Sequence, residues 1–544
     1  MGTYINKGNN GFRISRNSEY VDKSGLIAVI NATLDTKLRF TCVSRCRRFG
    51  KSMAAEMLAA YYDQSCDSHE LFVDLEIAHD PQYERHLNKY PVIYVDMTGF
   101  VSRFKDSSIV NEIQERLLTD ISATYHDIDV REGDDLMDYL ASVVSVTKQH
   151  FILIIDEWDA ILREFGQDNA VKDSYVDFLR RMFKDTASEV FAAVYMTGIL
   201  PVKKYKTQSA LNNFTEYSML DPKRMSPYFG FTKKETMSLC VKYGMDFDEM
   251  EKWYDGYQIG SESSMFNPNS VMQALYSDWC TSYWGKTAAY DAISPYIKMN
   301  FNGLKDDILN LLAGGRVKVN TAKFQNDISV VETKDDVLTL LIHLGYLSFD
   351  RVKSECHVPN YEVAEELKNA VEDMGWSEVV KSLQQSEQLL EATLHGDAER
   401  VTHSIGVAHD ENTSILSYND ENSLVCVLSI AYYCARKDYV MHRELATGKG
   451  FADLVLMPRK NVDSPAIIIE LKCDKDVDSA IDQIKRKQYP DKVMQYLNLP
   501  STEESTTHLL LVGINYDRKS KTHTCRIEKW EFEKQNQKMV EDVQ

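Results

Sequence analysis

Short apolar runs alternate with amphipathic stretches through the first ~200 residues, and this pattern constrains the fold more than any other feature of the chain. The apolar runs predict strands at Leu38–Ser44, Pro91–Met97, His150–Asp156 and Val190–Thr197. The periodicity between them predicts helices at Ser52–Asp63, Ser108–Tyr125, Leu136–Lys148 and Val171–Ser188. Parallel strands need crossover helices, so this alternation predicts an α/β domain with a parallel sheet.

The remainder of the chain indicates further domains, because 544 residues are too many for one ordinary core. Mostly helical periodicity from Phe231 to about Trp284 suits a lid packed against the α/β core. Helices at Asp306–Leu312 and Asp335–Leu344 precede a two-stranded ribbon, an order that resembles a winged helix. The polar segment from Glu528 to Gln544 is expected to fray.

The net charge, the apolar runs and the cysteine spacing of the chain exclude some classes of function. The formal charge of −20 argues against a protein that coats nucleic acid without specificity. From His442 to Lys492, however, ten Lys and Arg balance nine Asp and Glu, which permits DNA binding there. No apolar run approaches the ~18 residues of a membrane span. The ten cysteines show no paired spacing beyond Cys42 and Cys46, so we expect reduced thiols, a cytoplasmic location and no membrane.

A phosphate-binding loop is predicted directly after the first strand. The segment Arg45-Cys-Arg-Arg-Phe-Gly50-Lys51-Ser52 precedes a helix, and Gly50, Lys51 and Ser52 fit the backbone, lysine and Mg²⁺-binding hydroxyl positions. Arg45 stands where the usual pattern begins with glycine. The three arginines of the loop could contact phosphate or pair with acidic neighbours.

A second apolar strand ends in adjacent carboxylates, Asp156 and Glu157. In phosphate-loop ATPases the aspartate orients Mg²⁺ and the glutamate polarises the attacking water. A buried strand followed by a helix-capping aspartate would look the same. Thr197, at the end of the next strand, could be a polar sensor or simply a solvated strand end.

These motifs resemble the AAA-ATPase-like family over roughly the first 280 residues. The shared elements are Tyr20-Val-Asp22-Lys23, Ser44–Ser52, Ile155-Asp-Glu-Trp-Asp159, Thr197-Gly-Ile-Leu-Pro and Trp253-Tyr-Asp-Gly-Tyr257 with Asn267-Pro268. The family's loop reads S-R-P-R-R-F-G-K-S, so the missing glycine fits the family and Cys46 replaces its proline. The resemblance implies ATP and Mg²⁺ as cofactors, Glu157 as a catalytic group, Ser52 and Asp156 at the metal, and a nucleotide site made of Arg45, Arg47, Arg48, Phe49, Gly50, Lys51, Ser52 and Asp156.

The segment Gly450–Lys472 carries a second constellation. Asp453 opens one apolar strand, and Glu470 and Lys472 lie two residues apart at the end of another. Residues two apart share a strand face, so Glu470 and Lys472 project together, and Asp453 joins them if the strands pair. Two carboxylates and an ammonium suit a divalent cation and an activated water, which predicts hydrolysis of a phosphodiester. A solvated Glu–Lys pair at a strand end is the plain alternative.

This second constellation resembles the PD-(D/E)XK nuclease superfamily. The superfamily core of helix, strand meander, helix and further strand matches Asn422–Ala435, Tyr439–Leu445, Ala452–Met457, Ala466–Leu471, Ser479–Gln488 and His508–Asn515. The resemblance implies that Asp453 and Glu470 bind the metal and that Lys472 is catalytic. It also adds Glu444 as a further carboxylate and Gln483 from the following helix, with Tyr489 at the end of that helix.

Together these features predict four domains in an α/β chain: a P-loop AAA-ATPase-like domain at 1–230, a helical lid at 231–300, a winged-helix-like linker at 301–375 and a restriction-endonuclease-like domain at 376–544. We expect an ATPase coupled to a Mg²⁺-dependent nuclease acting on DNA, or on RNA, in a chain that could form homo-oligomers. The competing hypotheses are a signalling ATPase whose nuclease-like domain only binds partners, and a nucleic-acid scaffold with neither activity.

Overall fold

The computed structural model divides the chain into two compact units, Met1–Asn302 with Val317–Glu366 and Gly303–Arg316 with Leu367–Gln544. The four predicted domains are a finer division and stay a prediction. The structure describes residues 2–129, 133–166, 168–184, 187–202, 211–260, 262–284, 301, 303–312, 314–324, 331–373, 377–412, 428, 431–446, 451–459, 462, 464–491, 493, 507–533 and 536–543.

The first unit is built on a five-stranded parallel sheet, as the alternating pattern predicts. Its order is β2-β3-β4-β1-β5, with bounds β1 (Phe40–Ser44), β2 (Val92–Asp96), β3 (Phe151–Asp156), β4 (Phe191–Gly198) and β5 (Thr215–Tyr217). Because the strands are parallel, the carboxyl ends of β1, β3 and β4 meet at one edge of the sheet. The four predicted strands are therefore confirmed, and β5 is an addition.

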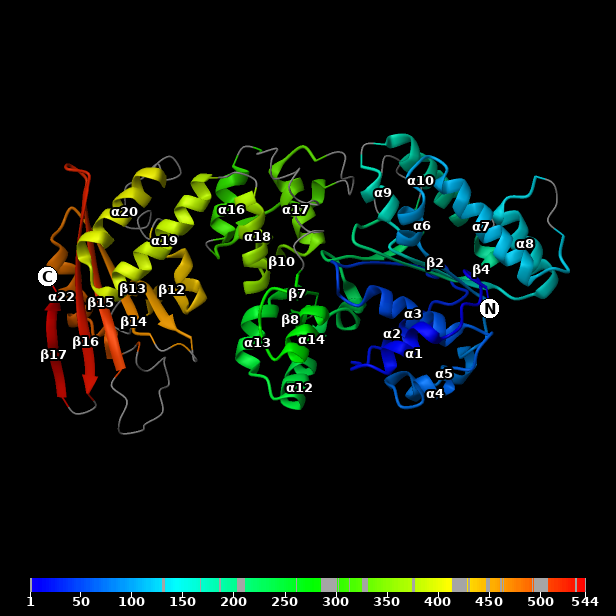
Figure 1. Cartoon of the computed structure of the whole chain (residues 1–544), viewed down its shortest axis with the longest axis horizontal. Coiled ribbons are helices and arrows are strands. Elements are labelled where there is room, and N and C mark those ends of the chain that lie inside the picture. Colours follow the sequence, from blue (N-terminus) through cyan, green and yellow to red (C-terminus); the bar gives the residue numbers. More distant parts are fainter. Residues whose placement is uncertain are drawn as a thin grey trace. The chain divides into compact units, whose positions relative to one another are not determined.

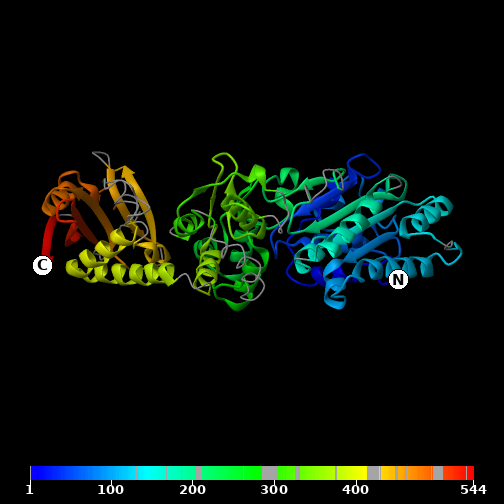
Figure 2. The same cartoon turned by 90° about the horizontal axis from the view of Figure 1, so that it is seen from above.

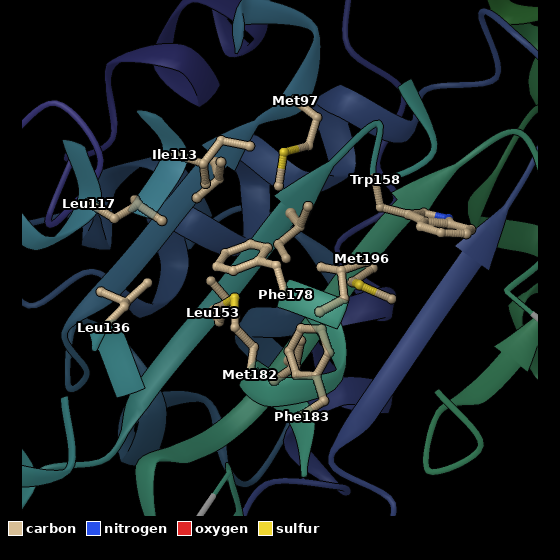
Figure 3. Close-up of a cluster of buried hydrophobic side chains, with 14 of the residues drawn as sticks. Met97, Ile113, Leu117, Leu136, Leu153, Trp158, Phe178, Met182, Phe183 and Met196 are labelled. Carbon is tan, nitrogen blue, oxygen red and sulfur yellow. The ribbon is translucent and has the colours of Figure 1, made fainter. Parts of the chain in front are cut away.

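Helices cover both faces of this sheet (Figure 1). The helices on one face are α6 (Met97–Arg103), α7 (Ile109–Thr124), α8 (Leu136–Thr147), α9 (Ala160–Glu164), α10 (Asn169–Phe183) and α11 (Ala187–Val190). The helices on the other face are α1 (Asn10–Arg16), α2 (Gly25–Asn31), α3 (Lys51–Tyr62), α4 (His69–Phe72), η1 (Glu76–His79) and α5 (Tyr83–His86). Figure 3 shows part of the first core, where Leu153 of β3 lies among Ile113, Phe178 and Met182. Alternate residues of β3 enter the two cores, which explains its unbroken apolar run.

The predicted lid contains helices and a small antiparallel sheet. The helices are α12 (Lys233–Tyr243), α13 (Phe247–Tyr254) and α14 (Pro268–Ser277), after η2 (Lys223–Tyr228). The strands β6 (Phe231–Thr232), β7 (Tyr257–Ile259) and β8 (Glu262–Phe266) form a sheet in the order β6-β8-β7. A capping box between Thr232 and Glu235 starts α12. Such short strands leave too few residues for a period-two pattern, so sequence periodicity detects only the helices.

The helix and ribbon predicted after residue 330 are present. They are α17 (Lys334–Leu344), β10 (Ser348–Asp350) and β11 (Glu355–His357), joined by β9 (Val317–Lys318) in the sheet order β10-β11-β9, with η3 (Thr321–Lys323) nearby in sequence. The turn after α17 depends on Gly345, whose φ is +90°. The boundary between the two units falls within the following helix, α18 (Tyr361–Asp373).

The second unit contains a six-stranded mixed sheet in the order β12-β13-β14-β15-β16-β17. Its elements are α16 (Leu304–Leu312), α19 (Ser377–His395), α20 (Ala398–Asn412), η4 (Tyr433–Lys437), β12 (Tyr439–Ala446), β13 (Phe451–Pro458), β14 (Ala466–Cys473), α22 (Val477–Arg486), β15 (Thr507–Asp517), β16 (Thr522–Glu533) and β17 (Asn536–Val543). Only β14 and β15 pair in parallel, with α22 between them in the chain. Helices α19 and α20, yellow in Figure 2, pack on one face and α22 packs on the other.

The order of elements in the second unit confirms the predicted strand, helix and strand succession. Most of the predicted helix Asn422–Ala435 lies outside the described residues. The expectation that Glu528–Gln544 frays is wrong, because this segment supplies the end of β16 and all of β17. Strand β16 pairs with β15 along eleven residues, from Thr522 to Phe532. A strand near the sheet edge needs an apolar side chain only where it faces the core, as at buried Ile527, so its sequence reads as polar.

Candidate functional site

The first site lies where β1 passes into α3. Gly50 precedes the helix with a φ of +85°, a left-handed conformation that glycine adopts without strain, and no atom lies within 4 Å of where its Cβ would be. No side chain caps the N-terminus of α3. Its first backbone N–H groups therefore stay available for an anion, which is how phosphate loops bind nucleotides.

Acidic and basic groups converge at this edge of the sheet. The Nζ atom of Lys51 lies 3.1 Å from the carbonyl oxygen of Cys46 and 3.4 Å from Oε1 of Glu157. Asp156 accepts a hydrogen bond from the Thr197 hydroxyl. Burial raises the pKa of Asp156, while hydrogen bonds from Ser52 and Thr197 oppose that shift. The structure thus brings together the groups that the two motifs predicted separately.

A pocket of about 430 Å³ opens beside the loop. Of the predicted residues, Arg47, Arg48, Phe49, Gly50, Lys51, Ser52 and Glu157 line it, whereas Arg45 and Asp156 do not. Aromatic and apolar side chains make much of the remaining wall, including Tyr20, Met57, Tyr228, Phe231 and Met272. Sequence reasoning did not assign these residues to the site; the motif around Tyr20 and Lys23 was the available signal.

The three loop arginines occupy different surroundings. Arg45 is fully buried and donates to the carbonyl oxygens of Ser44 and Tyr217, at 2.9 and 3.1 Å. Burial lowers the pKa of Arg45 to about 10. Arg47 is half-buried, and Arg48 is exposed and donates to the carbonyl oxygen of Tyr283. The guanidinium of Arg45 is therefore turned toward the main chain, and only the other two line the pocket.

The second site lies where β13 and β14 pair. Leu454 is opposite Ile469, so Asp453 and Glu470 are the next residues along this antiparallel ladder. Oδ2 of Asp453 accepts from the backbone N–H of Leu471 at 2.7 Å. Nζ of Lys472 lies 2.9 Å from Oε1 of Glu470. The predicted same-face arrangement of Glu470 and Lys472 is thus present, with Asp453 on the neighbouring strand.

Glu470 is the most unusual group of this site. It is 1% exposed, and its Oε1 accepts from both Lys472 and Gln483. Its Oε2 is buried and accepts no hydrogen bond from any described residue. Burial, followed by the charge of Asp453, raises the pKa of Glu470 to about 7. Helix α22 supplies Gln483, whose Nε2 also lies 3.4 Å from the hydroxyl of Tyr489.

These groups fit a Mg²⁺ ion. A buried carboxylate oxygen without a donor is costly unless a cation compensates it, and Mg²⁺ is commonly held by one or two carboxylates and water. Among the described residues, no cluster of three or more His, Cys, Asp or Glu could hold a metal, and Asp453 and Glu470 are the two carboxylates that the described part of this site offers. Glu444 lies in β12, and its side chain is not among those described.

Comparisons with known proteins give distant relatives. An uncharacterized protein in the vnfD 5' region of Azotobacter chroococcum mcd 1 is 24% identical over 278 residues, which span 49% of this chain and 50% of that protein. The chain therefore matches about half the length of this curated relative.

No described helix has the length and apolar character that a membrane span requires.

Among solved structures, the chain is similar to Cdc6p from Pyrobaculum aerophilum, with 12% identity over 64% of this chain and 93% of that chain, and a TM-score of 0.22. It is also similar to the ORC2 protein of Aeropyrum pernix, with 11% identity over 68% of this chain and 99% of that chain, and a TM-score of 0.28. These scores are too low to support a conclusion about this chain.

Two family models match separate parts of the sequence. Residues 11–207, which contain strands β1 to β4 and the phosphate loop of the first unit, match the model described as a predicted AAA-ATPase. Residues 421–524, which contain Asp453, Glu470 and Lys472, match the model of the PD-(D/E)XK nuclease superfamily. The chain therefore combines a AAA-ATPase-like domain with a PD-(D/E)XK nuclease superfamily domain.

Proposed function

We propose that this protein binds and hydrolyses ATP in its first unit and cleaves DNA in a Mg²⁺-dependent reaction in its second unit, under the control of the bound nucleotide. The observation that carries the nuclease assignment is Oε2 of Glu470, a buried carboxylate oxygen that accepts no hydrogen bond from the described residues and lies beside the Asp453 strand. Such an oxygen is prepared for a cation.

In the ATP site, each predicted residue has a distinct part. The uncapped N-terminus of α3 and the ammonium of Lys51 would bind phosphates. Ser52 and Asp156 would hold Mg²⁺, and Glu157 would accept a proton from the attacking water. The apolar wall around Tyr20 and Met272 suits the flat face of a nucleobase.

In the nuclease site, Asp453 and Glu470 would hold Mg²⁺. The bound ion would supply a Lewis acid and lower the pKa of a water molecule. Lys472 and Gln483 both donate to Oε1 of Glu470, and this fixes the carboxylate so that Oε2 remains for the metal. The ammonium of Lys472 would also position the water and offset negative charge on the phosphate during cleavage.

A second candidate is a regulatory ATPase whose nuclease-like domain binds nucleic acid or protein without cutting. The burial of the second site favours it, since Glu470 and Lys472 are only 1% and 6% exposed. A phosphodiester must reach these groups to be cleaved. A domain that has kept the fold but closed the site would bind partners through other surfaces.

Incubation of the purified protein with supercoiled plasmid, linear DNA and RNA separates the two candidates. The reactions contain Mg²⁺ or EDTA, with and without ATP. Cleavage that requires Mg²⁺ and is lost in Lys472→Ala supports the nuclease. ATP turnover without cleavage of any substrate, in protein that binds nucleic acid, supports the regulatory candidate. Turnover that persists in Lys51→Ala would contradict the assignment of the ATP site.

A further inference from the structure

The carboxylate of Glu157 is held between two cations. Oε2 lies 2.6 Å from Nη2 of Arg163, and Oε1 lies 3.4 Å from Nζ of Lys51. A general base needs an oxygen free to accept a proton from water. Both carboxylate oxygens of Glu157 therefore face a cation instead of an open position for water. In this arrangement Glu157 is poorly placed to act as a base.

The backbone of Glu157 is also held in an unusual conformation. Its φ is +52°, a left-handed conformation that is unfavourable for a residue with a side chain. The backbone N–H donates toward Oδ1 of Asp156 at 3.1 Å and Oγ1 of Thr197 at 3.4 Å. An unfavourable conformation next to a reactive group persists only when its surroundings hold it there.

Arg163 is itself fixed by motif residues whose role the proposed function leaves open. Its Nε lies 3.1 Å from Oδ2 of Asp159, one turn earlier at the start of α9. Asp159 is fully buried and also accepts from the backbone N–H groups of Ile199 and Leu200, after β4. The segments Ile155–Asp159 and Thr197–Pro201 therefore form one support that places the guanidinium against Glu157.

We propose that Arg163 is a positioning residue that restrains the Glu157 carboxylate, also while ATP is bound. Lys51 pairs with Glu157 in this structure but is the predicted phosphate ligand, so an arriving nucleotide competes with Glu157 for its ammonium. Loss of that contact leaves Arg163 as the remaining ion-pair partner among the contacts described here. Arg163 thereby limits how readily the carboxylate turns toward water. This inference rests on the proposed ATP hydrolysis.

Steady-state ATP turnover by the full-length protein tests the restraint. In Arg163→Gln, kcat is expected to rise about fivefold, which corresponds to ~1 kcal/mol of barrier. KM for ATP should change little, because Arg163 does not line the pocket. Arg163→Lys, which keeps a positive charge, is expected to reverse most of the increase. Arg116→Gln is the matched control, since it breaks an exposed 3.0 Å pair with Glu112 elsewhere in the same unit.

Binding of a fluorescent ATP analogue distinguishes failure of the proposed restraint on Glu157 from failure of the proposed ATP site. If the wild type binds the analogue and kcat of Arg163→Gln is unchanged or falls toward that of Glu157→Gln, the restraint is overturned. Arg163→Met is measured in parallel; if neither variant binds the analogue, Arg163 is needed for the fold and the restraint is also overturned. If the wild type itself does not bind, the proposed ATP site has failed, and the inference fails with it.

Discussion

At the scale of single residues, Glu470 links the electrostatics of the second unit to its stability. Burial and the nearby charge of Asp453 raise its pKa from 4.5 to about 7. The folded protein therefore retains a proton on Glu470 at pH values where the unfolded chain releases it. The free energy of unfolding of the metal-free protein should fall as pH rises from 4.5 through 7, by about 3 kcal/mol in total.

Urea unfolding in EDTA, followed by a probe of the second unit at several pH values, measures this effect. Glu470→Gln is the control, since its amide does not titrate but can still accept hydrogen bonds from Lys472 and Gln483. The variant should lose the downward slope between pH 4.5 and 7. A wild-type profile as flat as that of the variant would mean that Glu470 ionises normally in the fold.

The residues of both sites differ in how far sequence could predict them. The phosphate loop is a continuous motif, because Gly50, Lys51 and Ser52 are consecutive in the chain. Side chains alternate between the two faces of a strand, and this is enough to place Glu470 and Lys472 on the same face. Arg163 could not be predicted, because its role depends on an ion pair with Glu157 and a second one with buried Asp159. The pocket wall was missed for the same reason: Tyr20 and Met272 meet only after folding.

At the scale of elements, buried strands were the most predictable part of the fold. Strand β3 enters a core on each face, so it reads as one apolar run. Strands β6, β7 and β8 are two to five residues long and leave no clear pattern. Strands β16 and β17 are polar because they lie at the outer side of their sheet, where main-chain pairing replaces much of the apolar burial.

The Trp253–Tyr257 motif packs against two other segments of the first unit. Gly256 has a φ of +103°, and a Cβ there would lie 1.9 Å from the carbonyl oxygen of Pro359. Trp253 and Tyr361 stack edge to face with ring centroids 4.9 Å apart. Tyr257 contacts Phe49 of the phosphate loop, with ring centroids 5.1 Å apart. The motif therefore joins the loop to the segment that leads into α18.

Gly256→Ala is predicted to destabilise the first unit strongly. Gly244→Ala is a matched control, because its φ of +77° carries a similar backbone cost while no atom lies within 4 Å of the added Cβ. The control should cost about 1 kcal/mol, and Gly256→Ala roughly 2 kcal/mol more. Thermal unfolding of the transition that ATP stabilises would measure both. Equal losses in the two variants would show that the Pro359 contact is not tight.

At the scale of the whole molecule, nucleotide control of cleavage requires communication between the proposed ATP site and the proposed cleavage site. We predict that ATP changes the rate at which the wild type cleaves plasmid, and that Lys51→Ala abolishes this response. Lys51 belongs to the phosphate loop of the first unit, so we expect its replacement to act on cleavage through nucleotide binding. Initial cleavage rates with and without ATP give the comparison. Identical ATP responses in the wild type and Lys51→Ala would show that nucleotide bound at the phosphate loop does not control cleavage.

The proposed nuclease site is tested by the Mg²⁺-dependent cleavage rate of Asp453→Ala beside that of the wild type, with binding of a fluorescent ATP analogue as the measure of folding. Asp453 would share the metal with Glu470. Asp453→Ala is expected to lose Mg²⁺-dependent cleavage of DNA and to keep the wild-type affinity for the analogue. Cleavage by Asp453→Ala at the wild-type rate would contradict the proposed nuclease site.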